Sequence, residues 1–148
     1  MTEQSEQQLA APTVPPRRGG FWLGVGLAAV ALTQLVRIVI LLTDQEVFLN
    51  DKFAFSLNLP TAVMYVVYAV AILFIARYLQ THWSSLSDVT KFGFVLIAAG
   101  GFSNVAERII FGHVTDYIHL ANGVLNLADF YIIIGVILIF INRRHQKS

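Results

Sequence analysis

Four apolar segments alternate with polar connections along the chain. They are Phe21–Leu42, Thr61–Leu79, Val89–Val105 and Leu125–Ile141. A membrane-spanning helix needs about 20 mainly apolar residues, a length that the first two segments reach. The other two reach it only if their polar outer ends lie at the interface or line a wet cavity. Because the connections are short, we predict an all-α membrane protein in which four transmembrane helices form a compact up-down bundle.

The connection between the last two segments is unusually polar. Asn104 and Arg108 are four positions apart, so on a helix they share a face. Asn126 and Asp129 are three apart and are expected on one face at the start of the next helix, with Asp116 in the connection. Ionisable groups are costly to place at a membrane boundary, so this stretch is the candidate functional site.

A different period marks the outer connection Thr43–Pro60. Its apolar residues are Phe53, Phe55, Leu57 and Leu59, and they alternate with small or polar ones. A period of two predicts a strand with one apolar face, which we expect on the membrane surface as a small extracytoplasmic β element.

Composition supports a membrane protein and narrows its chemistry. Hydrophobic residues make up 56% of the chain and charged residues 13%, and the mean hydropathy is +0.66. This composition is far too apolar for an ordinary soluble domain. The absence of cysteine excludes disulfides, thiol nucleophiles and thiolate metal sites. The net charge of +1 provides no basic field for nucleic acid.

The distribution of charge predicts the orientation in the membrane. Under a four-span arrangement most basic residues fall on one side: Arg17, Arg18, Arg77, Lys91, Arg143, Arg144 and Lys147. Most acids fall on the other: Asp44, Glu46, Asp51, Glu107, Asp116 and Asp129. Since basic residues favour the cytoplasm, both termini are expected there and the polar stretch on the outer face. Arg37, inside the first segment, needs a partner, and the outer acids are the nearest candidates.

Two carboxylates suffice to hydrolyse a peptide bond without cysteine or a cofactor. Close carboxylates share a proton; the ionised one deprotonates water and the protonated one polarises the scissile carbonyl. Asp116 and Asp129 are the candidates. Alternatively, Asp116 is a turn residue and Asp129 a helix N-terminal acid favoured by the dipole. Spacing leaves both interpretations open.

The neighbouring polar residues have two interpretations each. Asn104 and Asn126 either orient a carboxylate or substrate, or join helices by hydrogen bonds. Arg108 either braces the loop or binds a lipid phosphate or carboxylate, and its simplest role is to reach towards headgroups. Gly100 and Gly101 are expected to allow close helix packing.

A metal site is the weaker hypothesis for the connection. His113, Asp116 and His119 are spaced by three, as ligands on one helical face would be. However, Gly112 and Thr115 favour a non-helical loop, and no helical HExxH base accompanies them. We therefore predict no metal and interpret the histidines as surface residues.

The polar stretch resembles the lipoprotein signal peptidases (signal peptidase II). That family has a Gly-rich helix with Asn and an acid-Arg pair, then Gly-x-Val-x-Asp-aromatic, then Asn-x-Ala-Asp. The matching residues are Gly100, Gly101, Asn104, Glu107 and Arg108, then Gly112, Val114, Asp116 and Tyr117, then Asn126, Ala128 and Asp129. Several motifs in the same order make the resemblance specific over this part of the chain.

Elsewhere the chain departs from the family pattern. The family has Asp-Gln-x-x-Lys in the first span. Here Thr33 replaces the acid, Gln34 matches, and Arg37 keeps the positive charge. In the outer connection, where the family has a small sheet that cradles substrate, Asn50 matches but Lys52 replaces a glycine. Glu107 for Asp extends the acid by one methylene.

The resemblance implies a membrane aspartic endopeptidase that removes the signal peptide from diacylglyceryl-modified prolipoproteins, just before the lipidated cysteine. Asp116 and Asp129 would be catalytic, with no cofactor. Asn104, Arg108, Asn126 and Asn50 would contact substrate or support the pair. The expected location is the bacterial cytoplasmic membrane, and the expected partners are the prolipoprotein and membrane lipid. The alternative, favoured by Thr33 and Lys52, is a catalytically silent homologue that binds lipoproteins or assists assembly.

The expected organisation has three parts. Residues 1–20 form a disordered cytoplasmic leader, residues 21–142 a four-helix membrane peptidase domain, and residues 143–148 a basic cytoplasmic tail. A cleaved signal peptide is the alternative for the N-terminus, but the first apolar run is long, contains Arg37 and lacks a small-residue cleavage site. We expect a monomer that does not bind nucleic acid.

Overall fold

The computed structural model describes residues 19–43, 45–52, 60–121 and 123–145. Helices dominate it, with short strands and one 3-10 turn between them. In chain order the elements are α1 (Gly19–Leu41), β1 (Phe48–Asn50), α2 (Thr61–His82), η4 (Trp83–Ser85), α3 (Asp88–Phe111), β2 (Val114–Asp116), β3 (Ile118–Leu120), β4 (Gly123–Leu125) and α4 (Leu127–His145).

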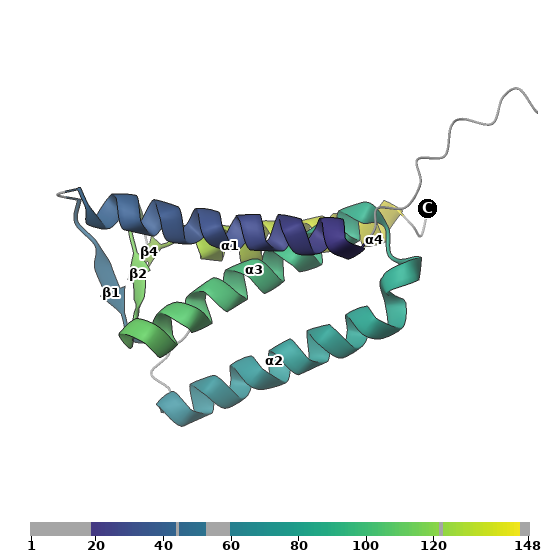
Figure 1. Ribbon diagram of the computed structural model, residues 1–148, viewed down its shortest axis with the longest axis horizontal. Coiled ribbons are helices and arrows are strands. Elements are labelled where there is room, and N and C mark those ends of the chain that lie inside the picture. The colour runs from purple at the N-terminus through teal and green to yellow at the C-terminus, as the bar shows by residue number, and fades with distance from the viewer. Residues whose placement is uncertain (1–18, 44, 53–59, 122, 146–148) are drawn as a thin grey trace, which may run out of the picture.

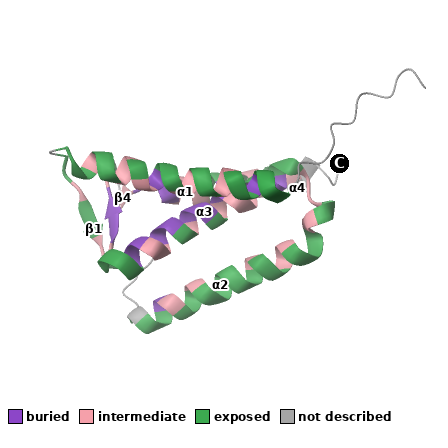
Figure 2. Ribbon diagram, in the orientation of Figure 1, coloured by how far each residue is buried: buried purple, intermediate pink, exposed green. Residues whose placement is uncertain are grey.

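Helix α3 is the centre of the molecule, and α1 and α4 pack against it (Figure 1). Helix α2 stands apart and leaves most of its side chains exposed (Figure 2). The compact bundle predicted from the short connections is therefore realised by three helices and not by α2. The start of α1 and the end of α4 lie at one end of the molecule, and the strands lie at the other (Figure 1).

Within the described residues, three helices are long and apolar enough to cross a membrane: α1, Ala62–Ser85 and α3. The apolar part of α4, Leu127–Asn142, is shorter. A total of four membrane spans therefore stays a prediction. The third predicted segment ended at Val105, but α3 continues to Phe111 because its polar residues find partners inside the protein. The fourth was predicted from Leu125, which belongs to β4 instead.

The strands form two small antiparallel sheets. Strand β1 pairs with β2, with Phe48 opposite Asp116 and Asn50 opposite Val114. Strands β3 and β4 form a hairpin. The strand predicted through Phe53 and Leu59 falls on residues 53–59, which lie outside the described residues. The β element that is described, β1, precedes that segment and joins the outer connection to the candidate site.

Burial in this protein is inverted relative to a soluble domain. Large apolar side chains are exposed along α1, α2 and α4, whereas the buried residues near the strands are mostly polar (Figure 2). Lipid tails solvate apolar side chains, and polar groups in a membrane must find partners within the protein. This distribution is typical of a membrane protein.

Glycines shape the packing of α3 and its end. A Cβ on Gly100 would lie 2.4 Å from the carbonyl oxygen of Ala128, so this glycine allows α3 and α4 to approach closely, as predicted. Gly101 faces open space, and the same expectation for it is wrong. Gly112 ends α3 with a φ of 79° and donates its N–H to the Arg108 carbonyl. This left-handed turn directs the chain into β2 and hence positions Asp116.

Candidate active site

One face of α3 supplies the floor of the site. Asn104, Glu107 and Arg108 are buried there, and Asn104 and Arg108 share the face that their spacing predicted. Arg108 donates from Nη1 to the Asn104 carbonyl (3.3 Å) and from Nη2 to the Lys52 carbonyl (2.8 Å). The second bond ties the outer connection to α3, which is the bracing role considered for Arg108.

Asp116 lies at the end of β2 and is only 1% exposed. Its Oδ1 accepts a hydrogen bond of 2.7 Å from Asn126 Nδ2, and its Oδ2 accepts one of 2.9 Å from Asn50 Nδ2. Strand pairing brings Asn50 to this carboxylate, since β1 runs antiparallel to β2. Both oxygens of Asp116 are thus held by side-chain amides from separate parts of the chain.

Asp129 lies in the first turn of α4. Its Oδ1 accepts from Asn104 Nδ2 at 2.8 Å, and its Oδ2 accepts from the backbone N–H of Asn126 at 3.2 Å. The Asn126 Oδ1 in turn accepts from the Asp129 N–H at 3.1 Å, which completes a reciprocal capping box. Asn126 therefore precedes the helix as its cap. The spacing had suggested instead that it lies on the same helical face as Asp129.

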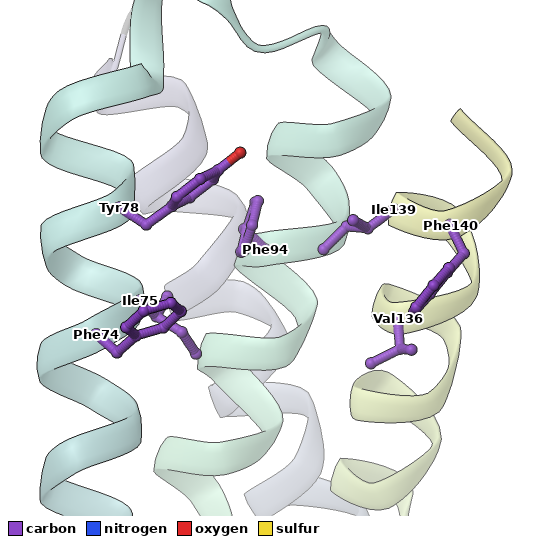
Figure 3. A pocket seen from close by; sticks show the side chains of 7 residues that line it. All are labelled: Phe74, Ile75, Tyr78, Phe94, Val136, Ile139 and Phe140. Atoms are coloured by element: carbon purple, nitrogen blue, oxygen red, sulfur yellow. The ribbon is translucent and has the colours of Figure 1, made fainter. Parts of the chain in front are cut away.

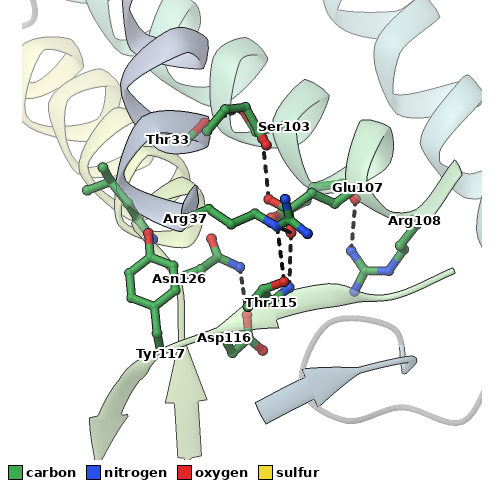
Figure 4. A network of polar contacts seen from close by, with 12 residues as sticks. Thr33, Arg37, Ser103, Glu107, Arg108, Thr115, Asp116, Tyr117 and Asn126 are labelled. Atoms are coloured by element: carbon green, nitrogen blue, oxygen red, sulfur yellow. Dashed lines mark hydrogen bonds and ion pairs between the residues drawn. The ribbon is translucent and has the colours of Figure 1, made fainter. Parts of the chain in front are cut away.

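Asn126 joins the two acids directly. Its amide nitrogen donates to Asp116 (Figure 4). Its backbone N–H donates to Asp129, and its amide oxygen accepts from the Asp129 N–H. The structure thus brings Asp116, Asp129, Asn104, Asn126 and Asn50 into one hydrogen-bonded group. Arg108 lies beside them on α3, so all six residues singled out in the sequence meet at one end of the molecule.

Burial raises the pKa of the Asp116 carboxyl above its ordinary value. The hydrogen bonds from Asn50 and Asn126 act against this shift, since they favour the ionised form. The charge of Asp129 raises the pKa further and that of Arg108 lowers it, so the net shift is upward. A carboxyl that holds its proton more tightly, next to a second carboxyl, is suited to acid-base chemistry.

A second polar layer supports β2 from the side of α1. Arg37 Nε lies 3.3 Å from Glu107 Oε2 and donates to Thr115 Oγ1 at 3.1 Å (Figure 4). The Thr115 N–H donates to the same Glu107 oxygen at 3.0 Å, and Gln34 donates to the other at 3.3 Å. The prediction that Arg37 pairs with an outer acid is confirmed, and the acid is Glu107.

Sequence reasoning missed three residues of this support. Thr33 bonds Ser103 across the α1–α3 contact at 2.8 Å, and Thr115 lies between Arg37 and Glu107. Thr33 and Arg37, like Ser103 and Glu107, are four positions apart. This matched polar spacing on two apolar helices was the available indication that their faces meet.

The metal hypothesis depended on a helical arrangement of His113, Asp116 and His119. The structure places these residues in and around β2 and β3, and His119 is exposed. The preference for a non-helical connection is confirmed. Among the described residues, no three His, Asp or Glu side chains gather as metal ligands.

The end of the bundle remote from the strands has a different character. An apolar groove of about 290 Å³ lies there between α2, α3 and α4 (Figure 3). Its lining consists of Phe74, Ile75, Tyr78, Phe94, Val136, Ile139 and Phe140. A single phenol is its only polar side-chain group, so the groove has no means to perform hydrolysis.

Comparison with known proteins gives a consistent result. A family model described as signal peptidase (SPase) II matches residues 24–143. A lipoprotein signal peptidase of Ralstonia nicotianae is 30% identical over 146 residues, covering 83% of each chain. That of Mesorhizobium japonicum is 35% identical over 79 residues. This second match spans only 47% of the relative's length and 50% of this chain.

Solved structures agree on the fold. A bacterial membrane enzyme determined by the in meso method at 2.3 Å resolution superposes with a TM-score of 0.70 at 18% identity, covering 88% of this chain and 91% of that one. A second, determined at 1.9 Å, gives a TM-score of 0.67 at 17% identity, covering 84% and 92%. With the family model matching most of the chain, this protein belongs to the signal peptidase II family.

Proposed function

We propose that this protein is a membrane aspartic endopeptidase that removes the signal peptide from diacylglyceryl-modified prolipoproteins just before the lipidated cysteine. The observation that carries the proposal is the bridge through Asn126, which couples Asp116 to Asp129 by hydrogen bonds of 2.7 to 3.2 Å. The relatives named above as lipoprotein signal peptidases supply the substrate class.

The two acids work as a unit in this mechanism. They share one proton because burial and their mutual repulsion oppose double ionisation. The ionised carboxylate takes a proton from water, and the protonated one donates to the scissile carbonyl oxygen as the tetrahedral intermediate forms. The first acid then gives its proton to the leaving amine while the second takes one back from a hydroxyl of the intermediate, so the pair returns to its starting state. Amide donors from Asn50, Asn104 and Asn126 fix both carboxylates during the cycle.

The arrangement of the helices supports a site at the outer membrane boundary. The polar group lies at the strand end of the bundle, and the described chain ends lie at the other end (Figure 1). With four spans and both termini in the cytoplasm, the two acids face outwards at the level of the lipid headgroups. There an anchored diacylglyceryl group would present the bond next to the modified cysteine. We propose that the protein acts as a monomer.

The departures from the family pattern are compatible with an enzyme. Thr33 is satisfied by Ser103, and Arg37 finds Glu107 across the helix interface. Lys52 contributes its backbone carbonyl to Arg108, a bond that does not depend on its side chain. The features that favoured a silent homologue are thus accommodated around the two acids, so we prefer the peptidase to the binding protein.

Replacing either acid with its amide tests the proposal. Asp116→Asn and Asp129→Asn should each reduce cleavage of a lipidated precursor by at least about 1,000-fold, since the amide neither accepts nor shares a proton. The double variant should be no less active than either single one, because the pair acts as a unit. Glu46→Gln is a matched control, since Glu46 is an exposed acid in the outer connection.

The assay uses purified, detergent-solubilised protein at equal folded concentration. The pH dependence of kcat/KM should be bell-shaped, with two apparent values that belong to the pair. Because burial raises the pKa of Asp116, full ionisation of the pair requires a higher pH than for two free carboxyls. Activity should persist in excess chelator. Near-normal turnover in either amide variant would remove that residue from the mechanism.

A further inference from the structure

Tyr117 holds the chain on both sides of Asn126. Its backbone N–H donates to the Leu125 carbonyl at 3.0 Å, just before Asn126. Its phenolic oxygen accepts from the Leu127 N–H, just after Asn126, at 3.2 Å. One residue therefore spans the junction between β4 and α4, and it follows Asp116 directly in the chain.

The Leu127 N–H belongs to the first turn of α4 and has no acceptor within the helix itself. The Tyr117 hydroxyl supplies that acceptor, while Asn126 and Asp129 cap each other. The start of α4 is thus satisfied by three side chains, and two of them, Asn126 and Asp129, form the capping box. Only the phenol comes from outside this segment, so it fixes the capping box relative to β2.

Resting on the proposed function, we infer that Tyr117 is a positioning residue: its hydroxyl holds the β4–α4 junction and thereby sets the orientation of Asn126 between Asp116 and Asp129. The ring has no direct part in the chemistry. A hydroxyl is required because an aromatic ring alone keeps the packing of residue 117 but leaves the Leu127 N–H without an acceptor.

The inference predicts a change in pH dependence as well as in rate. Asp116 faces the charges of Asp129 and Arg108, and it accepts amide hydrogen bonds from Asn50 and Asn126. Tyr117 itself faces Glu107, Asp129 and the Tyr131 phenol. The bond from Asn126 lowers the pKa of Asp116, so a loosened Asn126 should allow that pKa to rise.

The test is Tyr117→Phe in the full-length protein, assayed by cleavage of a lipidated precursor across a pH series. We expect kcat to fall on the order of 10- to 100-fold with KM near the wild-type value, since alignment is lost and binding is kept. The basic limb of the kcat/KM profile, where the pair loses its shared proton, should move to higher pH. Tyr78→Phe removes a phenol from the apolar groove and should change neither the rate nor the limb.

Amide hydrogen exchange of the folded protein provides a second measurement that needs no turnover. The Leu127 N–H should be protected in the wild type and exchange at least about tenfold faster in Tyr117→Phe, while the middle of α4 is unchanged. An unprotected Leu127 in the wild type would overturn the inference even if the variant folded poorly. So would an unshifted basic limb in an active variant.

The two proposals fail separately. If the wild type cleaves the precursor and Asp116→Asn does not, the peptidase proposal stands, and a Tyr117→Phe variant with wild-type kcat and pH profile would overturn only the role of Tyr117. If the wild type fails to cleave, the proposed function fails, and the exchange experiment still decides whether Tyr117 caps α4.

Discussion

The strand end of α3 and the whole of α2 solve the same solvation problem in opposite ways. Helix α3 buries Ser103, Asn104, Glu107 and Arg108 in succession and pairs them with groups from α1, α4 and the outer connection. Helix α2 is comparably long, yet only 6% of its most apolar window is buried, against 39% for α3. It presents aliphatic and aromatic side chains on almost every face.

The difference shows where the specific interactions of this protein lie. An apolar side chain that faces lipid costs nothing and specifies little, because lipid tails resemble it. A polar side chain inside a membrane protein needs a partner in a defined place. The buried polar groups of α3 therefore define the geometry around Asp116 and Asp129, and α2 tolerates change. Substitutions at the two places should separate accordingly.

The largest effect on stability is expected from Arg37→Leu. This change leaves Glu107 buried without its cation. Removing one partner of a buried ion pair lowers the free energy of unfolding by about 3–5 kcal/mol. Folded yield should fall more than the specific activity of the protein that survives. The measurement is thermal unfolding in detergent together with folded yield, and Arg77→Leu, at an exposed position on α2, serves as the control.

Combining Arg37→Leu with Glu107→Gln should recover part of the stability, since no unpaired charge then remains. A wild-type yield accompanied by lost activity would assign Arg37 to the chemistry and contradict its structural role. A loss of equal size in Arg77→Leu would show that the position of the charge, and not its partner, decides the outcome.

Asn126→Ala is expected to have the next largest effect. Removing the amide uncouples the two acids, although Asn50 and Asn104 still hold one oxygen of each, and should lower kcat by about 100-fold, equivalent to about 2.7 kcal/mol. Asn142→Ala is the matched control at the other end of α4, where the side chain donates to Ser87 and Thr90. That control should lose stability and keep its kcat. Equal losses of kcat in the two variants would contradict the bridge.

The sequence predicted most of the candidate site because the necessary information was local. Asn104 and Arg108 are related by helical spacing, and Asp116 and Asp129 are placed by motifs of short range. Gly112 correctly indicated that the helix ends before Asp116. The capping relation of Asn126 was mistaken for a shared helical face, since a spacing of three fits both arrangements.

What the sequence could not provide depends on contacts between distant segments. The pairing of β1 with β2 brings Asn50 to Asp116, and the link from Arg37 to Glu107 crosses two helices. The separation of α2 was also unpredictable, because its apolar residues satisfy lipid and helix contacts equally well. Periodicity identifies the faces of a helix in a membrane but does not say which neighbour covers them.

The smallest effect should come from the exposed face of α2. Leu73 is 69% exposed, whereas Leu96 on α3 is 7% exposed. Leu73→Ala should change the free energy of unfolding by less than about 0.5 kcal/mol, since lipid or detergent fills the vacated space. Leu96→Ala should cost about 1–2 kcal/mol. Transfer of a leucine side chain between lipid and the protein interior is nearly neutral, so the cost comes from the cavity and the lost packing contacts. Thermal unfolding of both variants in one detergent measures the difference. A loss in Leu73→Ala as large as that in Leu96→Ala would mean that protein and not lipid covers this face of α2, and both the proposed monomer and the contrast between the two helices would then be wrong.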